Sequence, residues 1–300
     1  MGGQHSAIST RPGEARTEVR MQTNSTSKYL QLEHVNLHYL DYGGPGPQTL
    51  VFVHGGGANA HWFDLAGPTL ARSCRVLAVD LRGHGDSSWA EPPVYTFEAH
   101  MQDLRALFQA EHLTAPLLMG HSMGGILLTQ YTGTWPQEVG ALIVCDSRPV
   151  YSEEAADLLQ QMGQRPGREY PTLEEYIAHF RIRPDGLRAP PAVHHYIARS
   201  AARQLPNGTW THKLDRRVYA QRTSTNTLPF WQRITCPALV LRAEHSSRLT
   251  PAFLQQIREV CPHVEWSDVA GAGHHLMLDQ PEQTAILVRA FLQRHHRIRG

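Results

Sequence analysis

The sequence has few cysteines and lacks any long hydrophobic run. Its four cysteines, Cys74, Cys145, Cys236 and Cys261, are widely scattered, and no Cys-x-x-Cys pair occurs. We therefore expect them to be reduced and without a zinc or redox role. No segment approaches the roughly 18 apolar residues of a membrane-spanning helix, and the N-terminus lacks the apolar core of a signal peptide. These absences favour a cytoplasmic protein.

An excess of charge of either sign is also absent. The chain has 28 Lys and Arg against 27 Asp and Glu, which gives a net charge of +1. This balance offers no electrostatic basis for binding nucleic acid or an anionic membrane surface. We therefore expect a small-molecule substrate as the partner, with no nucleic acid and no membrane, and the sequence gives no indication of an oligomeric state.

Motifs for metals and nucleotides are absent as well. The 19 histidines show no His-Glu-x-x-His or other metal-ligand spacing. No Gly-Lys-Ser/Thr loop for phosphate binding occurs either. We therefore expect neither a metal nor a cofactor.

Apolar segments of strand length alternate with helix-like segments along most of the chain. Phe97, Met101, Leu104 and Phe108, for example, show helical spacing between two such segments. Near-continuous apolar strands that alternate with helices predict an α/β fold, with a mostly parallel sheet and helices on both faces. The expected strands are 29–32 and 35–39, which form an antiparallel entry, and then 50–54, 76–80, 116–119, 141–145, 238–241 and 264–269.

Two segments depart from this alternation. Residues 1–27 are polar and without apolar periodicity, which predicts a disordered leader. Between residues 150 and 231 strong apolar strand runs are absent, and Thr-Leu-Glu-Glu at 172–175 forms a capping box that opens an amphipathic helix. We expect 150–231 to be an inserted, mainly helical cap (lid), and 28–149 together with 232–300 to form the core domain.

The pentapeptide Gly-His-Ser-Met-Gly at 120–124 is the most informative functional motif. It follows an apolar strand and precedes a helix-like segment. Small residues on both sides of Ser122 allow a sharp strand-to-helix turn that lifts the hydroxyl from the sheet edge. Because a neutral serine is a poor nucleophile, it requires a nearby base. Our candidate is His274, in a Gly-x-Gly-His loop after the final expected strand.

Further glycine-rich motifs follow other strands. Residues 54–57 read His-Gly-Gly-Gly, residues 80–87 read Asp-Leu-Arg-Gly-His-Gly-Asp-Ser, and residues 271–274 read Gly-Ala-Gly-His. With Gly-His-Ser-Met-Gly-Gly between them, the chain resembles the α/β-hydrolase family in motif content and motif order, from about Tyr29 to Leu292. The resemblance implies the α/β-hydrolase fold and a serine hydrolase.

The resemblance also implies roles for particular residues. Ser122 would be the nucleophile, and His274 rather than His275 the general base. The backbone N–H groups of Gly56 and Met123 would form the oxyanion hole, in which preorganised donors stabilise negative charge on the carbonyl oxygen. We expect activity to rise as His274 loses its proton, with a midpoint near pH ~6.5 unless the paired acid raises it.

The third triad residue departs from the family pattern. An aspartate usually follows the penultimate strand, but Ser246 or Ser247 occupies that place here. Asp146, at the end of the strand after the nucleophile helix, and Glu244, immediately after the penultimate strand, could each orient the imidazole. We favour Asp146, because an aspartate at the carboxyl edge of the sheet points into the same crevice as Ser122.

Together these residues predict a serine hydrolase that cleaves a small-molecule ester or lactone through an acyl-enzyme intermediate. Other functions remain open. Carbon–carbon bond hydrolysis of the meta-cleavage-product type would use the same triad, with Arg148, Arg181 and Arg183 available to hold a substrate carboxylate. The departure at the acid position also allows a ligand receptor of low turnover. An acyltransferase would use the same acyl intermediate and pass it to an alcohol.

Overall fold

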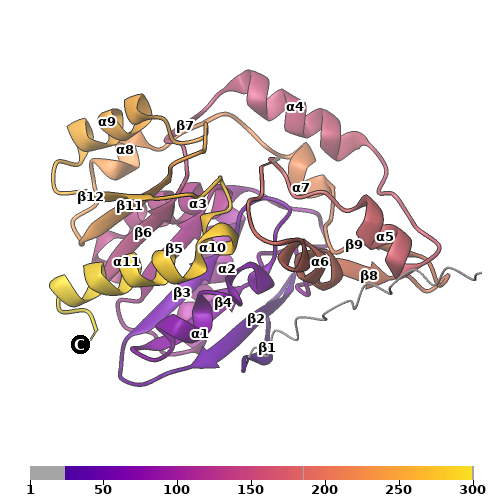
Figure 1. The fold of residues 1–300 in the computed structure, drawn as a ribbon, viewed down its shortest axis with the longest axis horizontal. Coiled ribbons are helices and arrows are strands. Elements are labelled where there is room, and N and C mark those ends of the chain that lie inside the picture. The colour runs from indigo at the N-terminus through magenta and orange to yellow at the C-terminus, as the bar shows by residue number, and fades with distance from the viewer. Residues whose placement is uncertain (1–23, 185, 299–300) are drawn as a thin grey trace, which may run out of the picture.

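The core of the structure is an eight-stranded sheet with helices on both faces (Figure 1). A computed structural model describes residues 24–184 and 186–298. The strands lie in the order β1-β2-β4-β3-β5-β6-β11-β12, and only the β1–β2 and β2–β4 pairs are antiparallel. Their bounds are β1 Thr26–Gln31, β2 Asn36–Gly43, β3 Thr49–Val53, β4 Arg75–Val79, β5 Leu117–His121, β6 Ala141–Cys145, β11 Ala238–Ala243 and β12 Glu265–Val269. The predicted α/β fold with a mostly parallel sheet is confirmed.

Alternate residues of the central strands face opposite layers of the core. In β3, Leu50 and Phe52 belong to one apolar cluster, whereas Val51 and Val53 belong to the other. Successive side chains of a strand point to opposite faces, so a sheet covered on both sides requires apolar residues at every position. This requirement explains the continuous apolar runs in the sequence.

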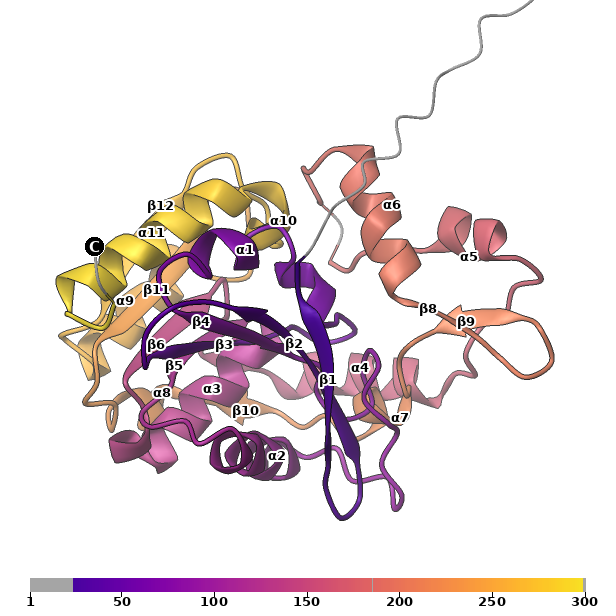
Figure 2. The ribbon, with the colours of Figure 1, turned by 90° about the horizontal axis from the view of Figure 1, so that it is seen from below.

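Helices cover the two faces of the sheet. Figure 2 shows α1 and α11 on one face and α2 and α3 on the other, and α9 packs into the same cluster as α2 and α3. Thr96 caps α2 by accepting a hydrogen bond from the Ala99 amide at 3.2 Å, as expected for a threonine that precedes a helix. The bounds are α1 Gly67–Leu70, α2 Phe97–Ala110, α3 Met123–Thr134, α9 Pro251–Val260, α10 Leu276–Asp279 and α11 Pro281–Arg294, with 3-10 helices η1 at Ala60–Phe63 and η2 at Pro136–Glu138.

Residues 150–231, here called the insertion, lie between β6 and β11 in the chain. The described residues of the insertion contribute no strand to the eight-stranded sheet. The side-chain oxygen of Thr172 accepts from the Glu175 amide at 3.1 Å, which fixes the start of α5. The elements are β7 Val150–Tyr151, α4 Glu153–Gln164, α5 Leu173–His179, α6 Pro191–Ser200, β8 Ala202–Gln204, β9 Trp210–His212, α7 Arg217–Ala220, β10 Thr225–Asn226 and α8 Leu228–Trp231.

Hydrogen bonds hold the insertion against the core near the strand ends. Asp279 in α10 accepts hydrogen bonds from the backbone N–H groups of Arg188 at 2.7 Å and Ala189 at 2.9 Å. The His212 ring, from β9, donates to the Gly57 carbonyl at 3.1 Å. The loop after β3 is therefore covered by the insertion.

The predicted leader of residues 1–27 ends too late. Thr26 and Ser27 already pair with Asp41 and Leu40 as the first residues of β1. A strand at the sheet edge is held by backbone hydrogen bonds to β2, and its mostly exposed side chains need no apolar pattern, so periodicity could not reveal it. Residues 1–23 of the predicted leader lie outside the described residues.

Two further observations concern the cysteines and the membrane. All four cysteines are buried and free of disulfides. In the part of the chain that the structure describes, no helix combines the length and the apolar character required to cross a membrane.

Candidate active site

Ser122 lies on a strained turn between β5 and α3. Its backbone has φ 52° and ψ −114°, a conformation that costs a non-glycine residue about 1–3 kcal/mol. The flanking glycines permit the turn, since a Cβ on Gly120 would lie 2.4 Å from the Gly124 carbonyl oxygen, and one on Gly124 would lie 2.3 Å from the Val53 carbonyl oxygen. The geometry is that of the strand-turn-helix expected around a nucleophilic serine.

His274 and Asp146 are in direct contact. Nδ1 of His274 lies 2.6 Å from Oδ2 of Asp146, so the ring carries its proton on Nδ1 and donates it to the carboxylate. Asp146 is fully buried at the end of β6 and, like Ser122, has a positive φ, 45°. The contact fixes the tautomer of His274, leaving the lone pair on Nε2 available to accept a proton.

Two more donors fix the Asp146 carboxylate. The hydroxyl of Ser246 donates to Oδ2, and the backbone N–H of Ala243 donates to Oδ1 at 3.2 Å. Glu244, the alternative acid, lies elsewhere: it is half exposed and accepts from the Gly271 amide at 2.7 Å. Of the two acids considered, the structure brings Asp146 and not Glu244 to the imidazole.

The surroundings of the pair favour a neutral imidazole. Burial lowers the pKa of His274 well below its ordinary value of 6.5, and the nearby side chains of His275, Arg248 and Arg148 lower it further. Burial raises the pKa of Asp146 to about 6, although its hydrogen bonds from Ser246 and Ala243 act in the opposite direction. At neutral pH the carboxylate is therefore ionised and the ring is ready to act as a base.

The two residues expected to form the oxyanion hole lie beside each other. A Cβ on Gly56 would lie 3.6 Å from Sδ of Met123, and one on the preceding Gly55 would lie 3.2 Å from Cβ of Ser122. Met123 is the first residue of α3, where a helix leaves its N–H groups without an internal acceptor. These amides come from the loop after β3 and from the N-terminus of α3.

A cavity of ≈ 620 Å³ contains all five of these residues in its lining. Ser122, His274 and Asp146 lie at the carboxyl ends of the strands, and Gly56 and Met123 lie next to them. Leu159 and Met162 from α4 form part of the opposite wall, so the cavity lies between the sheet and the insertion. Its volume is suited to a small molecule.

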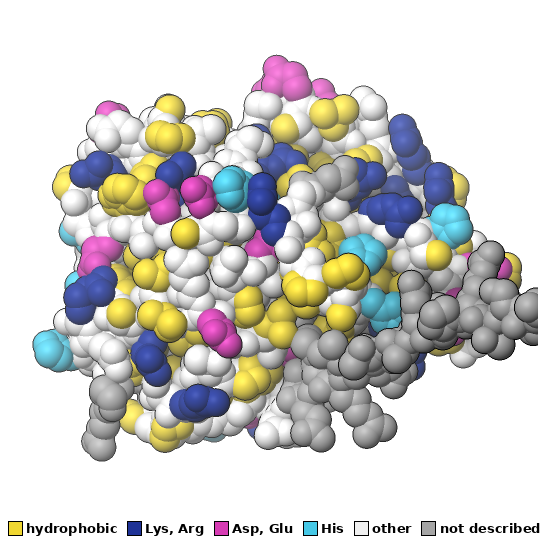
Figure 3. All heavy atoms as spheres, in the orientation of Figure 1, with side chains coloured by type: hydrophobic (Ala, Val, Ile, Leu, Met, Phe, Trp, Pro, Cys, Tyr) yellow, Lys and Arg dark blue, Asp and Glu magenta, His cyan; other side chains and the backbone are white. Residues whose placement is uncertain are grey.

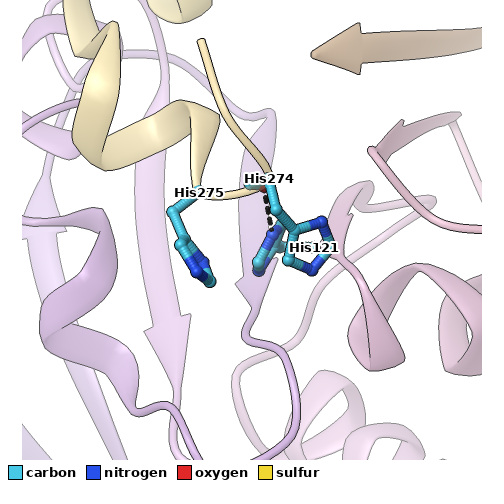
Figure 4. A group of neighbouring side chains, drawn as sticks. All are labelled: His121, His274 and His275. Carbon is cyan, nitrogen blue, oxygen red and sulfur yellow. Dashed lines mark hydrogen bonds between the residues drawn. The ribbon is translucent and has the colours of Figure 1, made fainter. Parts of the chain in front are cut away.

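The rings of His121, His274 and His275 lie close together, as Figure 4 shows. Nε2 of His121 donates to the His274 carbonyl at 2.9 Å, and Nε2 of His275 donates to the Pro184 carbonyl at 2.9 Å. One nitrogen of each ring lies within 4.8 Å of the others, a spacing that could hold a metal ion. Since Nδ1 of His274 is bound to Asp146, such an ion would have to take the lone pair on Nε2 that a base requires.

Comparison with known proteins decides the family. Residues 50–286 match the alpha/beta hydrolase family. The chain belongs to this family. An esterase of Mycobacterium tuberculosis, Rv0045c, is 27% identical over 262 residues, covering 84% of this chain and 85% of its own. The sn-1-specific diacylglycerol lipase ABHD11 of Mus musculus is 29% identical over 255 residues, covering 81% of this chain and 80% of its own.

Solved structures agree with this assignment of the fold. The structure of E-2-(acetamidomethylene)succinate hydrolase superimposes with a TM-score of 0.78 at 23% identity, covering 90% of this chain and 99% of its own. This alpha/beta hydrolase is therefore a hydrolase by family and by its relatives, and its fold matches a solved hydrolase over nearly its whole described length.

The site of this alpha/beta hydrolase also contains residues that sequence reasoning missed. Of the arginines considered for a substrate carboxylate, Arg148 and Arg183 line the cavity, but Arg181 does not and is instead bound to the carbonyls of Ala178 and Phe180. Arg222 and Arg248 line the cavity as well. No local sequence motif identifies either residue, because each lies in a loop and the fold of that loop brings its side chain to the cavity.

Proposed function

We propose that this alpha/beta hydrolase cleaves a small-molecule ester or lactone through an acyl-enzyme intermediate. Ser122 attacks the carbonyl carbon while Nε2 of His274 takes its proton, and Asp146 stabilises the imidazolium that forms. The amides of Gly56 and Met123 bind the developing oxyanion. The tetrahedral intermediate then expels the alcohol, which His274 protonates, and a water molecule activated by the same ring releases the acid.

The contact between His274 Nδ1 and Asp146 Oδ2 carries this proposal. It supplies the oriented base that Ser122 needs, and all three residues line one cavity. The serine also supports an acyl intermediate, because an alkyl group transferred to a serine would give an ether that the same site could not hydrolyse. The esterase and the lipase among the relatives support ester chemistry in particular.

The test compares turnover of p-nitrophenyl acetate and butyrate by the wild type and by Ser122→Ala. We expect the variant to lose at least about 10³-fold in turnover, since the nucleophile is removed. Equal rates in the two proteins would rule out this mechanism.

A fluorophosphonate probe separates the proposal from a receptor of low turnover. A catalytic serine should be labelled by the probe, and labelling should disappear in Ser122→Ala. If the probe fails to label Ser122 while a small ligand still raises the melting temperature, the receptor function is the better account.

A further inference from the structure

Arg222 is a buried arginine in the wall of the cavity. It follows α7, its side chain is 6% exposed, and it lines the same cavity as Ser122. Its guanidinium touches Sδ of Met123 and lies 5.1 Å from the centre of the Phe97 ring. These neighbours are a weak acceptor and an aromatic face, so neither supplies a negative charge.

Arg222 differs in this respect from the other buried arginine of the described residues, Arg82. Arg82 forms a two-point ion pair with Asp103, with N–O distances of 2.5 and 2.6 Å. No carboxylate of the described residues lies within 4.0 Å of Arg222. A buried charge without a counterion destabilises a protein, and the positive form of Arg222 is disfavoured by its burial. A bound ligand with a negative charge would supply the counterion that Arg222 lacks, and this would explain why the arginine is buried there.

The rest of the cavity has the same sign of charge. Arg148 and Arg248 also line it and also lack a carboxylate partner among the described residues. Asp146 is the one acidic residue in the described lining, and it is engaged by His274. Figure 3 shows several Lys and Arg side chains on the outer surface over the insertion, and others elsewhere on the same side of the molecule. The cavity is therefore a site for an anion, although the net charge of the chain is close to zero.

We infer that the substrate carries a carboxylate, and that the guanidinium of Arg222 binds it. This inference rests on the proposed ester hydrolysis at Ser122. A guanidinium offers two parallel N–H donors, which match the two oxygens of a carboxylate. Phe97, Met123 and Ile126 provide apolar lining for the hydrocarbon that links the carboxylate to the ester. The substrate class is a small ester that retains a free acid group.

Matched pairs of esters, each with a charged and a neutral member, test the inference. One pair is p-nitrophenyl hydrogen glutarate and its methyl ester, which place the charge on the acyl side. The other pair is 3-(butyryloxy)benzoate and 3-(butyryloxy)benzamide, which place it on the alcohol side. In one of the two pairs we expect kcat/KM of the wild type to be about 10- to 100-fold higher for the acid, the range of a hydrogen-bonded charge pair.

Variants assign that preference to Arg222. In Arg222→Met the ratio of kcat/KM for the acid to that for the neutral ester should fall to about one. In Arg222→Lys the ratio should be intermediate, because lysine keeps the positive charge but lacks the planar guanidinium with its two parallel donors. Arg258→Met, which removes an exposed arginine on α9, should keep the wild-type ratio. The melting temperature of Arg222→Met should rise, since an unpaired buried charge is replaced by an apolar side chain.

Several outcomes would overturn the inference. Equal kcat/KM for acid and neutral ester in both pairs would do so, as would a preference that survives in Arg222→Met. If p-nitrophenyl 4-phosphonobutyrate is preferred over the glutarate ester, the anion is a phosphonate or phosphate and not a carboxylate. If Arg222→Met does not fold, inhibition of the wild type by glutarate but not by its dimethyl ester provides the test.

The same experiment separates this inference from the proposed function. Turnover of the neutral esters, together with fluorophosphonate labelling of Ser122, would support the hydrolase mechanism whatever the carboxylate preference. If the enzyme hydrolyses the neutral esters and shows no preference for the esters with a carboxylate, only the role of Arg222 is overturned. Absence of both turnover and labelling would overturn the proposed function itself.

Discussion

The hydroxyl of Ser246 donates a hydrogen bond to the same carboxylate oxygen of Asp146 that contacts His274. Ser246 is one of the two serines, with Ser247, that stand after β11 where the family resemblance leads one to expect an aspartate. Asp146, at the end of the neighbouring strand β6, approaches the imidazole instead. In the proposed mechanism the acid therefore stands at the end of β6, and the Ser246 hydroxyl donates to it from the loop after β11.

Comparison of two carboxamide variants identifies the acid. Asp146→Asn should reduce kcat by about 10³- to 10⁴-fold, because the amide no longer stabilises the imidazolium. Glu244→Gln should stay close to wild-type activity, since Glu244 binds only the Gly271 amide and His245 among the described residues. Melting temperatures would show that both variants are folded. A larger loss in Glu244→Gln than in Asp146→Asn would reverse the assignment.

Ser246 is a positioning residue in this account. Ser246→Ala should lower kcat by roughly 10-fold, since a hydrogen bond to a charged group is removed but the acid remains. Ser246→Thr should restore most of the activity, because it retains the hydroxyl. Ser247→Ala, at the exposed neighbouring position, is the matched control. Unchanged turnover and an unchanged pH profile in Ser246→Ala would show that the hydroxyl does not support the acid.

The pH dependence of kcat/KM reports the protonation of His274. Since burial and then the charges of His275, Arg248 and Arg148 lower its pKa, activity should fall only below pH 6.5. In the proposed mechanism the neutral ring is the active form, so the pH at which activity is half lost should be lowered together with the pKa of His274 in the folded protein. The sequence alone predicts a midpoint of about 6.5, because its reference is the pKa of an exposed imidazole.

Removing a positive charge near His274 should raise the pH at which kcat/KM falls to half of its maximum. In Arg248→Gln the imidazolium is less disfavoured, so the midpoint should rise toward pH 6.5. Arg258→Gln should leave the midpoint unchanged. A downward shift in Arg248→Gln, or a wild-type midpoint above pH 7, would contradict this electrostatic description.

Acid should destabilise the fold through its buried histidines. Burial lowers the pKa values of His84, His100 and His121 well below 6.5. Below pH 6.5 the unfolded chain binds protons that these native rings do not, so the free energy of unfolding falls, by up to about 1.4 kcal/mol per pH unit for each group. Stability is therefore fully present above pH 6.5 and is lost as the pH decreases.

His100 offers a direct test, because neither of its ring nitrogens has a partner among the described residues. Denaturant titrations between pH 7.5 and 5.5 should show a shallower loss of stability in His100→Phe than in the wild type. His34→Phe, at an exposed position, should keep the wild-type slope. Identical slopes in all three proteins would show that His100 does not contribute.

Features that depend on residues close together in the chain, such as buried strands and the turn at Ser122, could be predicted from the sequence. Continuous apolar runs identified the buried strands, as at β6, where predicted and observed bounds agree. Glycines around Ser122 identified a turn that no larger residue could form. The edge strand β1 begins earlier than predicted, because an exposed strand paired to β2 carries little apolar signal.

The features that depend on long-range geometry could not be predicted. Ser246 and Asp146 are 100 residues apart, and only the parallel pairing of β6 with β11 brings them together. Arg222 reaches the cavity from the insertion, whose packing against the strand ends is not encoded in any local pattern. The choice between Asp146 and Glu244 was open for the same reason, since it is a question of distance.

The most direct measurement of the central claim is acid quenching of the wild-type enzyme during turnover of p-nitrophenyl butyrate, followed by mass analysis of its peptides. A butyryl group should be found on the peptide that contains Ser122, and none should be found on the corresponding peptide of Ser122→Ala. Continued turnover in Ser122→Ala, with no acyl group on that peptide in the wild type, would contradict the account.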